Sequence, residues 1–282
     1  MQKTFEVTGP VELEVRLTSG SIEIEAAKGA TTADVELIAY DEESQQLVDE
    51  ARVELRERHG RPHVLVDVPQ KRGGFNFGFL FGRHGIVCRV HLPEDSLLDI
   101  RTKSADVSVR GTAGGTNIAT ASGDVLLESL SGGLNVKSAS GDTRAREIAG
   151  GVNIQTASGD VELDAVRGGI NVASASGDVT IREAWDNVNV NTVSGDQEHG
   201  AVYQGNVSAH AVSGDVSVGV RRGSKVFLDC TTVSGDTRSE LDMLPDAPSG
   251  DGPLVELRVK TVSGDIDITR APAPADTQEV HA

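Results

Sequence analysis

The sequence predicts an all-β protein: a parallel β-solenoid of about nine 18-residue coils, preceded by a β-rich cap that contains one short helix. The first observation is that Ser-Gly-Asp recurs with a constant spacing at Ser122, Ser140, Ser158, Ser176 and Ser194. The second is that apolar and polar residues alternate between the copies, as in strands. The third is that aromatic residues make up only 3% of the chain, so the core must consist of small and β-branched side chains.

Residues 1–100 lack the period of the repeat, and we expect them to form the cap. Clean alternation predicts strands at 11–17 and 21–25, and further strands at 35–38 and 64–68. The segment from Glu42 to Arg52 begins with acidic residues and predicts the one helix. A cap is expected because a solenoid exposes unpaired strand edges at its ends.

Residues 101–270 carry the repeats and predict the solenoid itself. Ser104-Ala105-Asp106 stands one period before Ser122 and is a degenerate copy of the motif. Each coil is expected to hold two strands and two turns, one at Gly-Asp and one at Gly-Gly, because glycine reaches positive φ easily. Stacking the coils in register pairs their backbones and buries a continuous core.

Several columns of the repeat recur in phase. The apolar columns are expected to point inward and the alternate residues outward, so that Ile118 and Thr120 face in and Ala119 faces out. An asparagine column is predicted to form a hydrogen-bonded ladder at a turn, and not a recognition surface. Its members are Asn117, Asn135, Asn153, Asn171 and Asn189.

The last repeats are spaced more widely. Ser-Gly-Asp continues at Ser213, Ser234 and Ser263, and each step is longer than the one before it. We expect residues 240–253, rich in proline and glycine near their end, to form an exposed loop inserted in the last coil. Residues 271–282 have low complexity and predict a disordered tail.

The charge and the termini restrict the partners. The chain is acidic, with a net charge of −17, which argues against nucleic acid and against anionic membranes. The N-terminus has no apolar run after Lys3, and no stretch is long and apolar enough to span a bilayer, so we expect a cytoplasmic protein. Cys88 and Cys230 are then predicted to be reduced, buried thiols.

Aspartates of the repeat are expected to line one edge of the rod, among them Asp124, Asp142, Asp160, Asp178 and Asp196. Their charges repel, so each carboxylate is predicted to accept backbone N–H bonds in its own turn. The alternative is a calcium edge. The long period of the repeat and the lack of a Gly-Gly-x-Gly-x-Asp nonapeptide argue against it, and we predict no metal site.

The sequence offers no catalytic residues that we could name and implies no cofactor. His59 and His63 flank Gly and Pro, so they cannot share a helix face as metal ligands. The one irregular face, at Glu183-Ala184-Trp185-Asp186 and Glu198-His199, would be the site if the protein were a carbohydrate-active β-helix enzyme. Trp185 could stack on a sugar there, but filling a coil corner is the favoured interpretation.

One segment has an unusual composition. Residues 73–82 hold four of the six phenylalanines, Phe75, Phe77, Phe79 and Phe81. Their rings are expected to fold over the cap core. The alternative is an exposed interaction loop for a partner or a membrane surface, which is where any membrane contact would have to occur.

Over about residues 1–270 the chain resembles the bacterial putative-adhesin family of β-strand-repeat proteins, a family of unknown function. The resemblance rests on Thr-Val-Ser-Gly-Asp at Thr192, Thr232 and Thr261, on Val-Arg-Gly-Gly-Ile-Asn-Val from Val166, and on His91-Leu92-Pro93-Glu94-Asp95-Ser96 before the first repeat. It implies a non-catalytic scaffold or binding module, adhesin-like, with an unknown protein or glycan partner. The alternatives are a self-assembling structural protein and the carbohydrate-active enzyme.

Overall fold

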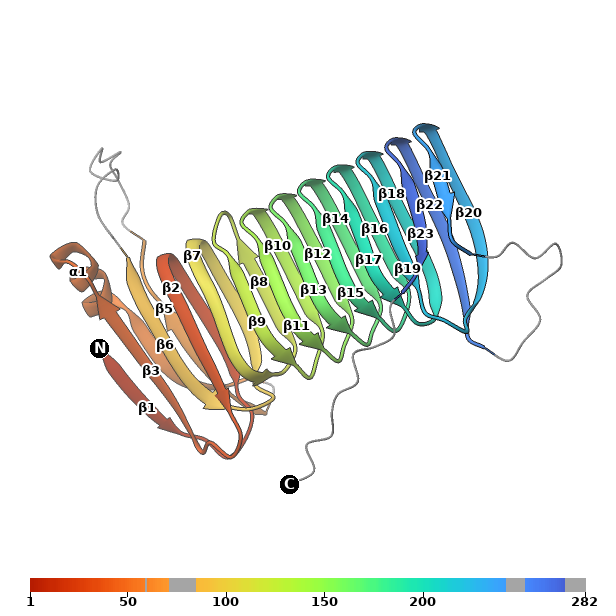
Figure 1. Cartoon of the computed structure of the whole chain (residues 1–282). Helices are drawn as coiled ribbons and strands as arrows, with labels where there is room; N and C mark the ends of the chain where they lie inside the picture. The colour runs from red at the N-terminus through yellow and green to blue at the C-terminus, as the bar shows by residue number, and fades with distance from the viewer. Residues whose placement is uncertain (59, 71–84, 242–251, 272–282) are drawn as a thin grey trace, which may run out of the picture.

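The computed structural model describes residues 1–58, 60–70, 85–241 and 252–271. It shows a rod of stacked β-coils, and the predicted parallel β-solenoid is confirmed (Figure 1). The segment with Phe75, Phe77, Phe79 and Phe81 and the tail 272–282 lie outside the described residues, as does a Ser-Gly-Asp at 249–251 that falls off the period of the repeat. In the described part of the chain, no helix has the length and hydrophobicity that a membrane crossing requires.

A central coil illustrates how the repeat folds. β10 (Leu134–Ser140) runs along one face of the rod, turns at Gly141-Asp142, and returns as β11 (Thr143–Ile148) on the other face. β10 pairs in parallel with β12 (Val152–Ser158) so that Asn135 is aligned with Asn153, the same position of the next repeat. The sequence period is therefore the strand register.

The first face of the rod is a continuous sheet. Its strand order along the rod is β4 (Arg52–Arg58), β5 (Arg61–Asp67), the first half of β2 (Glu12–Ala27), the first half of β7 (Leu97–Ala113), β8 (Thr116–Thr120), β10, β12, β14 (Ile170–Ser176), β16 (Val188–Ser194), β18 (Gly205–Ser213), β22 (Leu254–Ser263) and β20 (Lys225–Ser234).

The second face has the matching order. It runs β1 (Gln2–Glu6), β3 (Thr32–Ala39), β6 (Ile86–Pro93), the second half of β2, the second half of β7, β9 (Val125–Leu130), β11, β13 (Val161–Val166), β15 (Val179–Ala184), β17 (Gln197–Val202), β19 (Val216–Val220), β23 (Ile266–Arg270) and β21 (Thr237–Ser239).

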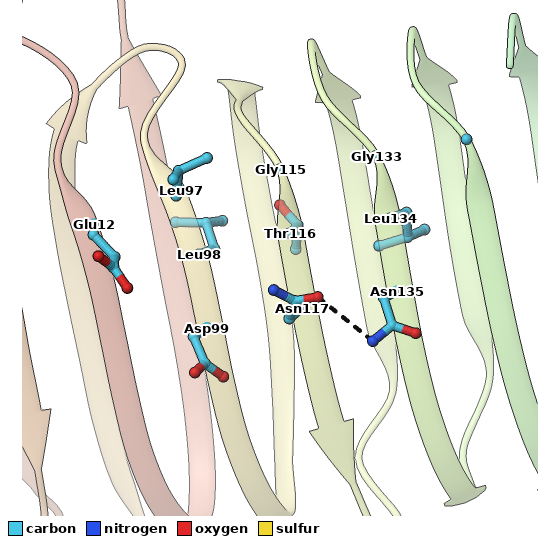
Figure 2. Close-up of a pocket in the computed structure, with 11 residues that line it drawn as sticks. Glu12, Leu97, Leu98, Asp99, Gly115, Thr116, Asn117, Gly133, Leu134 and Asn135 are labelled. Carbon is cyan, nitrogen blue, oxygen red and sulfur yellow. Dashed lines mark hydrogen bonds between the residues drawn. The ribbon is translucent and has the colours of Figure 1, made fainter. Parts of the chain in front are cut away.

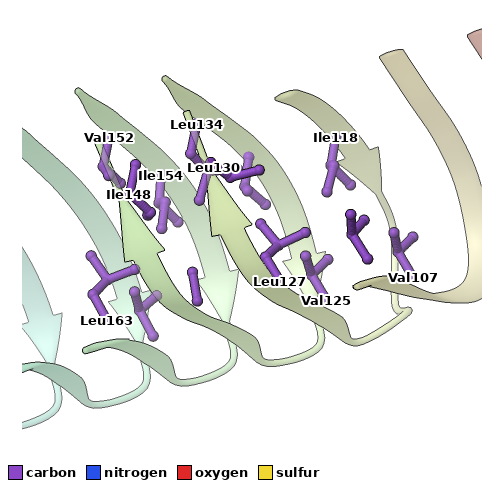
Figure 3. Close-up of a cluster of buried hydrophobic side chains, with 14 of the residues drawn as sticks. Val107, Ile118, Val125, Leu127, Leu130, Leu134, Ile148, Val152, Ile154 and Leu163 are labelled. Atoms are coloured by element: carbon purple, nitrogen blue, oxygen red, sulfur yellow. The ribbon is translucent and has the colours of Figure 1, made fainter. Parts of the chain in front are cut away.

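The core lies between the two faces and repeats with the coils (Figure 3). Ile118, Val136 and Ile154 point inward from the first face and stack one coil apart. Leu127 and Leu163 also point inward, from the second face and two coils apart. These side chains are at most 2% exposed, so each coil buries its apolar face on its neighbours, as the alternation predicted.

The first hundred residues contain more solenoid than their sequence shows. β2 bends at Gly20, where φ is +119°, and both of its halves pair in parallel with β7. β5 and β6 stack on the other side of β2, also in parallel. Residue 100 falls inside β7, so parallel pairing is continuous across the expected cap boundary.

Antiparallel strands and the helix cover the N-terminal end of this stack. β4 pairs with β5, β3 pairs with β6, and β1 pairs with β3, all antiparallel. The helix α1 (Glu42–Glu50) begins after Asp41, whose side chain accepts the Ser44 N–H at 2.6 Å, and packs near β3. It ends earlier than the predicted Arg52 because Ala51 is extended.

The last coils are not stacked in chain order. The widening steps predicted a loop at 240–253 inserted in the last coil, and most of that segment, 242–251, lies outside the described residues. β18 pairs with β22, and β22 pairs with β20, so that the coil of β22 and β23 lies between two coils that precede it in sequence (Figure 1). Ser213 and Ser234 are both aligned with Ser263. β20 and β21 therefore form the C-terminal end of the rod.

The two cysteines lie at opposite ends of the rod, so they cannot form a disulfide within one chain. Cys88 on β6 is buried, as predicted, and burial raises the pKa of its thiol to about 12. Cys230 on β20 is only half-buried, because nothing among the described residues stacks on the outer side of that coil.

Candidate functional site

The two faces of the rod differ in chemistry. We call two outward columns of the first face, those of Asn117 and Ala119 from β8 to β18, the amide face, and of these residues only Lys137 carries a full charge. The next outward column is apolar and holds Ala139, Ala157, Ala175, Val193 and Val212. The amide face consists of Asn117, Ala119, Asn135, Lys137, Asn153, Gln155, Asn171, Ala173, Asn189, Asn191, Ser208 and His210. The chain has a net charge of −17, yet this surface, which extends over six strands, has one charged residue.

The predicted asparagine ladder is confirmed, but it runs across strands and not at a turn. Successive amides are joined by Nδ2-to-Oδ1 hydrogen bonds, at 3.5 Å between Asn135 and Asn117 and at 2.8–2.9 Å in the following coils. Each interior amide thus uses one donor and one acceptor site in the ladder. A second N–H and further lone pairs stay available for a partner, held in a fixed orientation at the coil spacing.

A groove of about 420 Å³ runs beside the start of the ladder (Figure 2). Its lining includes the second glycine of three Gly-Gly corners and three leucines: Gly115, Gly133, Gly151, Leu97, Leu98 and Leu134. A Cβ atom at Gly115 would have ordinary contacts, so packing alone does not require glycine there. The first glycine of the pair is different: a Cβ at Gly132 would lie 2.5 Å from the backbone N of Gly115.

Acidic residues stand at the N-terminal end of this groove. Glu12 from β2 and Asp99 from β7 line it together with Asn117 (Figure 2). Each carboxylate has a basic partner, because Arg101 lies 2.9 Å from Asp99 and Arg58 lies 3.4 Å from Glu12. Because both carboxylates are paired, the groove presents a ligand with amide and backbone hydrogen-bonding groups and with little net charge.

The second face carries the charges, and several of them are paired with one another. Glu162 contacts Arg182 at 2.6 Å and Arg144 at 3.2 Å, and Arg182 also contacts Asp164 at 3.0 Å. The hydrogen bond from Arg182 lowers the pKa of Glu162. These exposed pairs contribute little to stability. Other charged side chains of that face, such as Arg146 and Glu147, form no ion pair among the described residues.

The aspartate edge exists, but its hydrogen bonds differ from the expected ones. Each carboxylate accepts a backbone N–H from the next coil, not from its own turn. The N–H of Asp142 donates to Oδ1 of Asp124 at 2.9 Å, and the contact repeats for Asp160, Asp178 and Asp196 at 2.8–3.0 Å. The reason is that in-register stacking brings the next turn closest to the side chain.

No metal-binding cluster of three or more His, Cys, Asp or Glu residues occurs in the described part of the chain. His63 lies on β5, where its Nε2 is 3.3 Å from Oε2 of the buried Glu14. His59 lies outside the described residues.

The irregular face does not converge on a site. His199 points into the core, where burial lowers its pKa to about 4. Glu198 is aligned with Thr180, near the start of β15, whereas Glu183 lies near its end and is aligned with Ala201. The residues that a carbohydrate-active enzyme would require are thus spread between the core, a corner and both ends of a strand.

Trp185 fills a coil corner, as expected. Its ring stacks on Tyr203, with 4.7 Å between centroids, and the Arg167 guanidinium covers the ring at 4.9 Å. Arg221 lies over Tyr203 at 5.0 Å. Sequence reasoning missed this stack, although its four members are each separated by one repeat period. Because both ring faces are covered, a sugar could not stack on Trp185.

The fold and the uncharged face define the class of the protein: a parallel β-solenoid with a polar, non-ionic side. More specifically, the chain belongs to the Toastrack family DUF4097, which it matches over residues 11–269. This agrees with the resemblance to an adhesin-like family of unknown function. No curated protein matches the chain.

Several solved structures are similar to the chain over almost its whole length. A "putative lipid binding protein" from Parabacteroides distasonis is 18% identical, with a TM-score of 0.45 and 96% of both chains covered. A "putative adhesin" from Bacteroides fragilis is 14% identical, with a TM-score of 0.44 and coverage of 95% of this chain and 96% of that chain. A "putative cell adhesion protein" from Clostridium sporogenes is 11% identical, with a TM-score of 0.29 and coverage of 96% and 99%.

Proposed function

We propose that this protein is a non-catalytic binding module whose amide face and adjoining groove hold an uncharged, hydroxyl-bearing partner, a neutral glycan. The observation that carries the proposal is the contrast between the two faces. The amide face repeats donors and acceptors at the coil spacing and has one charged residue, Lys137, whereas the second face is occupied by ion pairs.

The chemistry of the amide face suits a neutral glycan. An amide offers both a donor and an acceptor, which matches a hydroxyl group that also does both. The ladder holds the amides of Asn135, Asn153 and Asn171 in place before a ligand arrives, which reduces the ordering cost of binding. An anionic polymer would gain nothing from such a face and would be repelled by the chain's net charge.

The absence of catalysis is part of the same proposal. Hydrolysis of a glycan requires two carboxyl groups flanking the scissile bond. Glu12 and Asp99, which line the groove, are each held by an arginine in an ion pair. The geometry favours binding over acid catalysis there.

Binding to an array of neutral and acidic glycans tests the proposal. The wild type should retain neutral glycans, and Asn153→Glu should lose that binding by at least tenfold, because a carboxylate interrupts the ladder at its centre. Thr180→Glu makes a comparable change of charge on the second face and should bind like the wild type. Incubation with the retained glycan should release no new reducing ends.

Three results would refute the proposal. The array could retain no neutral glycan, or Thr180→Glu could abolish binding as fully as Asn153→Glu, or reducing ends could accumulate. Melting curves of both variants show whether each one is folded before its binding is compared.

A further inference from the structure

The two ends of the rod are finished differently. The N-terminal end is covered by the antiparallel strands β1, β3 and β4 and by α1. The C-terminal end is a bare coil, in which β20 pairs with β22 alone and β21 pairs with β23 alone among the described residues (Figure 1). Open strand edges of this kind favour pairing with another chain.

The inner side chains of the terminal coil show the consequence. Val255, Leu257 and Val259 of β22 are fully buried. The aligned residues of β20 are Val226, Leu228 and Cys230, which pack against the core on one side and are only half-buried. Phe227, on the outward side of the same strand, is 54% exposed. The apolar core therefore continues to the surface at this end.

The backbone of β20 also has a free side. The N–H of Lys225 donates to the carbonyl oxygen of Pro253 at 2.9 Å, so odd-numbered residues at the start of β20 direct their N–H and C=O groups toward β22. In a parallel pair, alternate residues direct these groups to opposite sides. Those of Val226, Leu228 and Cys230 therefore point away from the rod, and no described residue accepts or donates there.

We propose that this edge binds a second copy of the chain, with β20 pairing antiparallel to β20 of the partner subunit across a two-fold axis at Leu228. This arrangement places Leu228 opposite Leu228 of the partner subunit, and Val226 opposite Cys230 of the partner subunit. All inner residues then meet inner residues, and the two cores become one. The free backbone groups of these residues form the hydrogen-bonded pairs of the new ladder.

The charges near β20 favour a second copy of the chain as the partner and the register with the axis at Leu228. An axis one residue later would set Asp229 directly against Asp229 of the partner subunit, which is unfavourable. With the axis at Leu228, Lys225 lies diagonal to Asp229 of the partner subunit. Residues 225–239 carry two basic and two acidic side chains, so the end coil is neutral although the chain has a net charge of −17. Two copies repel least at this end.

Head-to-tail growth is disfavoured by the other end of the rod. Its outermost strand on the first face is β4, with the sequence Arg-Val-Glu-Leu-Arg-Glu-Arg. Charged residues on an edge strand are a common protection against edge-to-edge pairing. The contact is therefore isologous and closes at two copies.

Light scattering coupled to size exclusion tests the proposal. The wild type should have twice the chain mass of 29.6 kDa and dissociate on dilution. Leu228→Lys should be a monomer, because it places a charge in the middle of the contact. Leu55→Lys, at a half-exposed residue of β4, is the matched control and should remain a dimer. A monomeric wild type at every concentration, or a Leu55→Lys variant that also dissociates, would overturn the proposal.

Crosslinking provides a second measurement that does not depend on the folding of Leu228→Lys. In the variant Val226→Cys, the new thiol lies opposite Cys230 of the partner subunit at a separation suited to a disulfide. Mild oxidation should give a covalent dimer. Phe227→Cys faces the other side of the strand and should not crosslink to Cys230. Equal crosslinking of the two variants would contradict the register.

Discussion

At the scale of single residues, two polar side chains replace apolar ones in the core of the same coil, and only one of them has partners. Gln197 occupies the column of Val179 and Val216. Its Nε2 donates to Thr192 Oγ1 at 2.8 Å and to the carbonyl oxygen of His210 at 2.9 Å. His199 is 1% exposed, and neither of its ring nitrogens has a hydrogen-bond partner among the described residues.

Because His199 is buried without a hydrogen-bond partner among the described residues, we predict that it makes the free energy of unfolding depend on pH. Burial lowers its pKa from 6.5 to about 4, so the unfolded chain binds a proton more readily than the folded one. The contribution of neutral His199 to the free energy of unfolding should be complete above pH 6.5 and should be lost as the pH falls toward 4. The total loss should be roughly 3 kcal/mol, because each pKa unit corresponds to about 1.4 kcal/mol. His199→Ile, which matches Ile181 in the column, should raise stability at pH 7.5 and raise it more at pH 5. Urea unfolding at both pH values measures this; an equal gain at both would refute the assignment.

A second residue-scale prediction concerns the Ser-Gly-Asp corner. Gly159 has a φ of +132°, and a Cβ there would lie 2.3 Å from the carbonyl oxygen of Gly141. Gly159→Val should therefore destabilise the rod by at least about 3 kcal/mol. Lys137→Ala, on the amide face, should change stability by less than about 0.5 kcal/mol. Thermal melts compare them, and similar Tm values would show that the register assigned to the repeat is wrong.

At the scale of one element, the aspartate edge shows how stacking compensates a repulsive column. One oxygen of each carboxylate accepts the backbone N–H of the next coil, and the second oxygen of Asp142 lies 3.3 Å from Arg144. Because the backbone already supports the charged form, we predict that millimolar calcium leaves the Tm unchanged and that monovalent salt raises it slightly by screening. A saturable rise of several degrees with calcium, but not with magnesium, would instead identify the edge as a metal site.

The repeated elements could be predicted from sequence because each column of the repeat holds one kind of residue in one kind of environment. Inward Val and Ile, outward Asn and the corner Gly recur once in every repeat, and the structure pairs them at that period. Coils that lack the complete motif were not recognised. β2 turns at Ser19-Gly20-Ser21, without the aspartate, yet Ser21 is aligned with Asp106. Likewise, the covered faces of Trp185 depend on Arg167 and Tyr203, two neighbours that only the stacking register brings together.

At the scale of the whole molecule, the order of the coils cannot be derived from the columns. Every coil presents the same edges to its neighbours, so β18 could pair with β20 or with β22 equally well by pattern alone. Chain connection decides the order: the step from Ser234 to Ser263 is the longest between successive coils, and it lets the chain return past the coil it has just made. The spacing of the Ser-Gly-Asp copies alone suggested an insertion in the last coil. The structure shows instead that β22, in place of β20, pairs with β18.

Hydrogen exchange distinguishes the two orders directly. In the observed order, β22 has paired strands on both sides and β20 is the edge; in chain order the roles would be reversed. Amides of Val255, Leu257 and Val259 should therefore exchange slowly, and those of Val226, Leu228 and Cys230 should exchange fast, because their N–H groups point away from the rod. The exchange should be measured on the Leu228→Lys variant and on dilute wild type, because in these samples pairing between copies cannot protect β20. Slow exchange throughout β20 together with fast exchange in β22 would mean that the coils stack in chain order, and the proposed contact at Leu228 would then lose its edge strand.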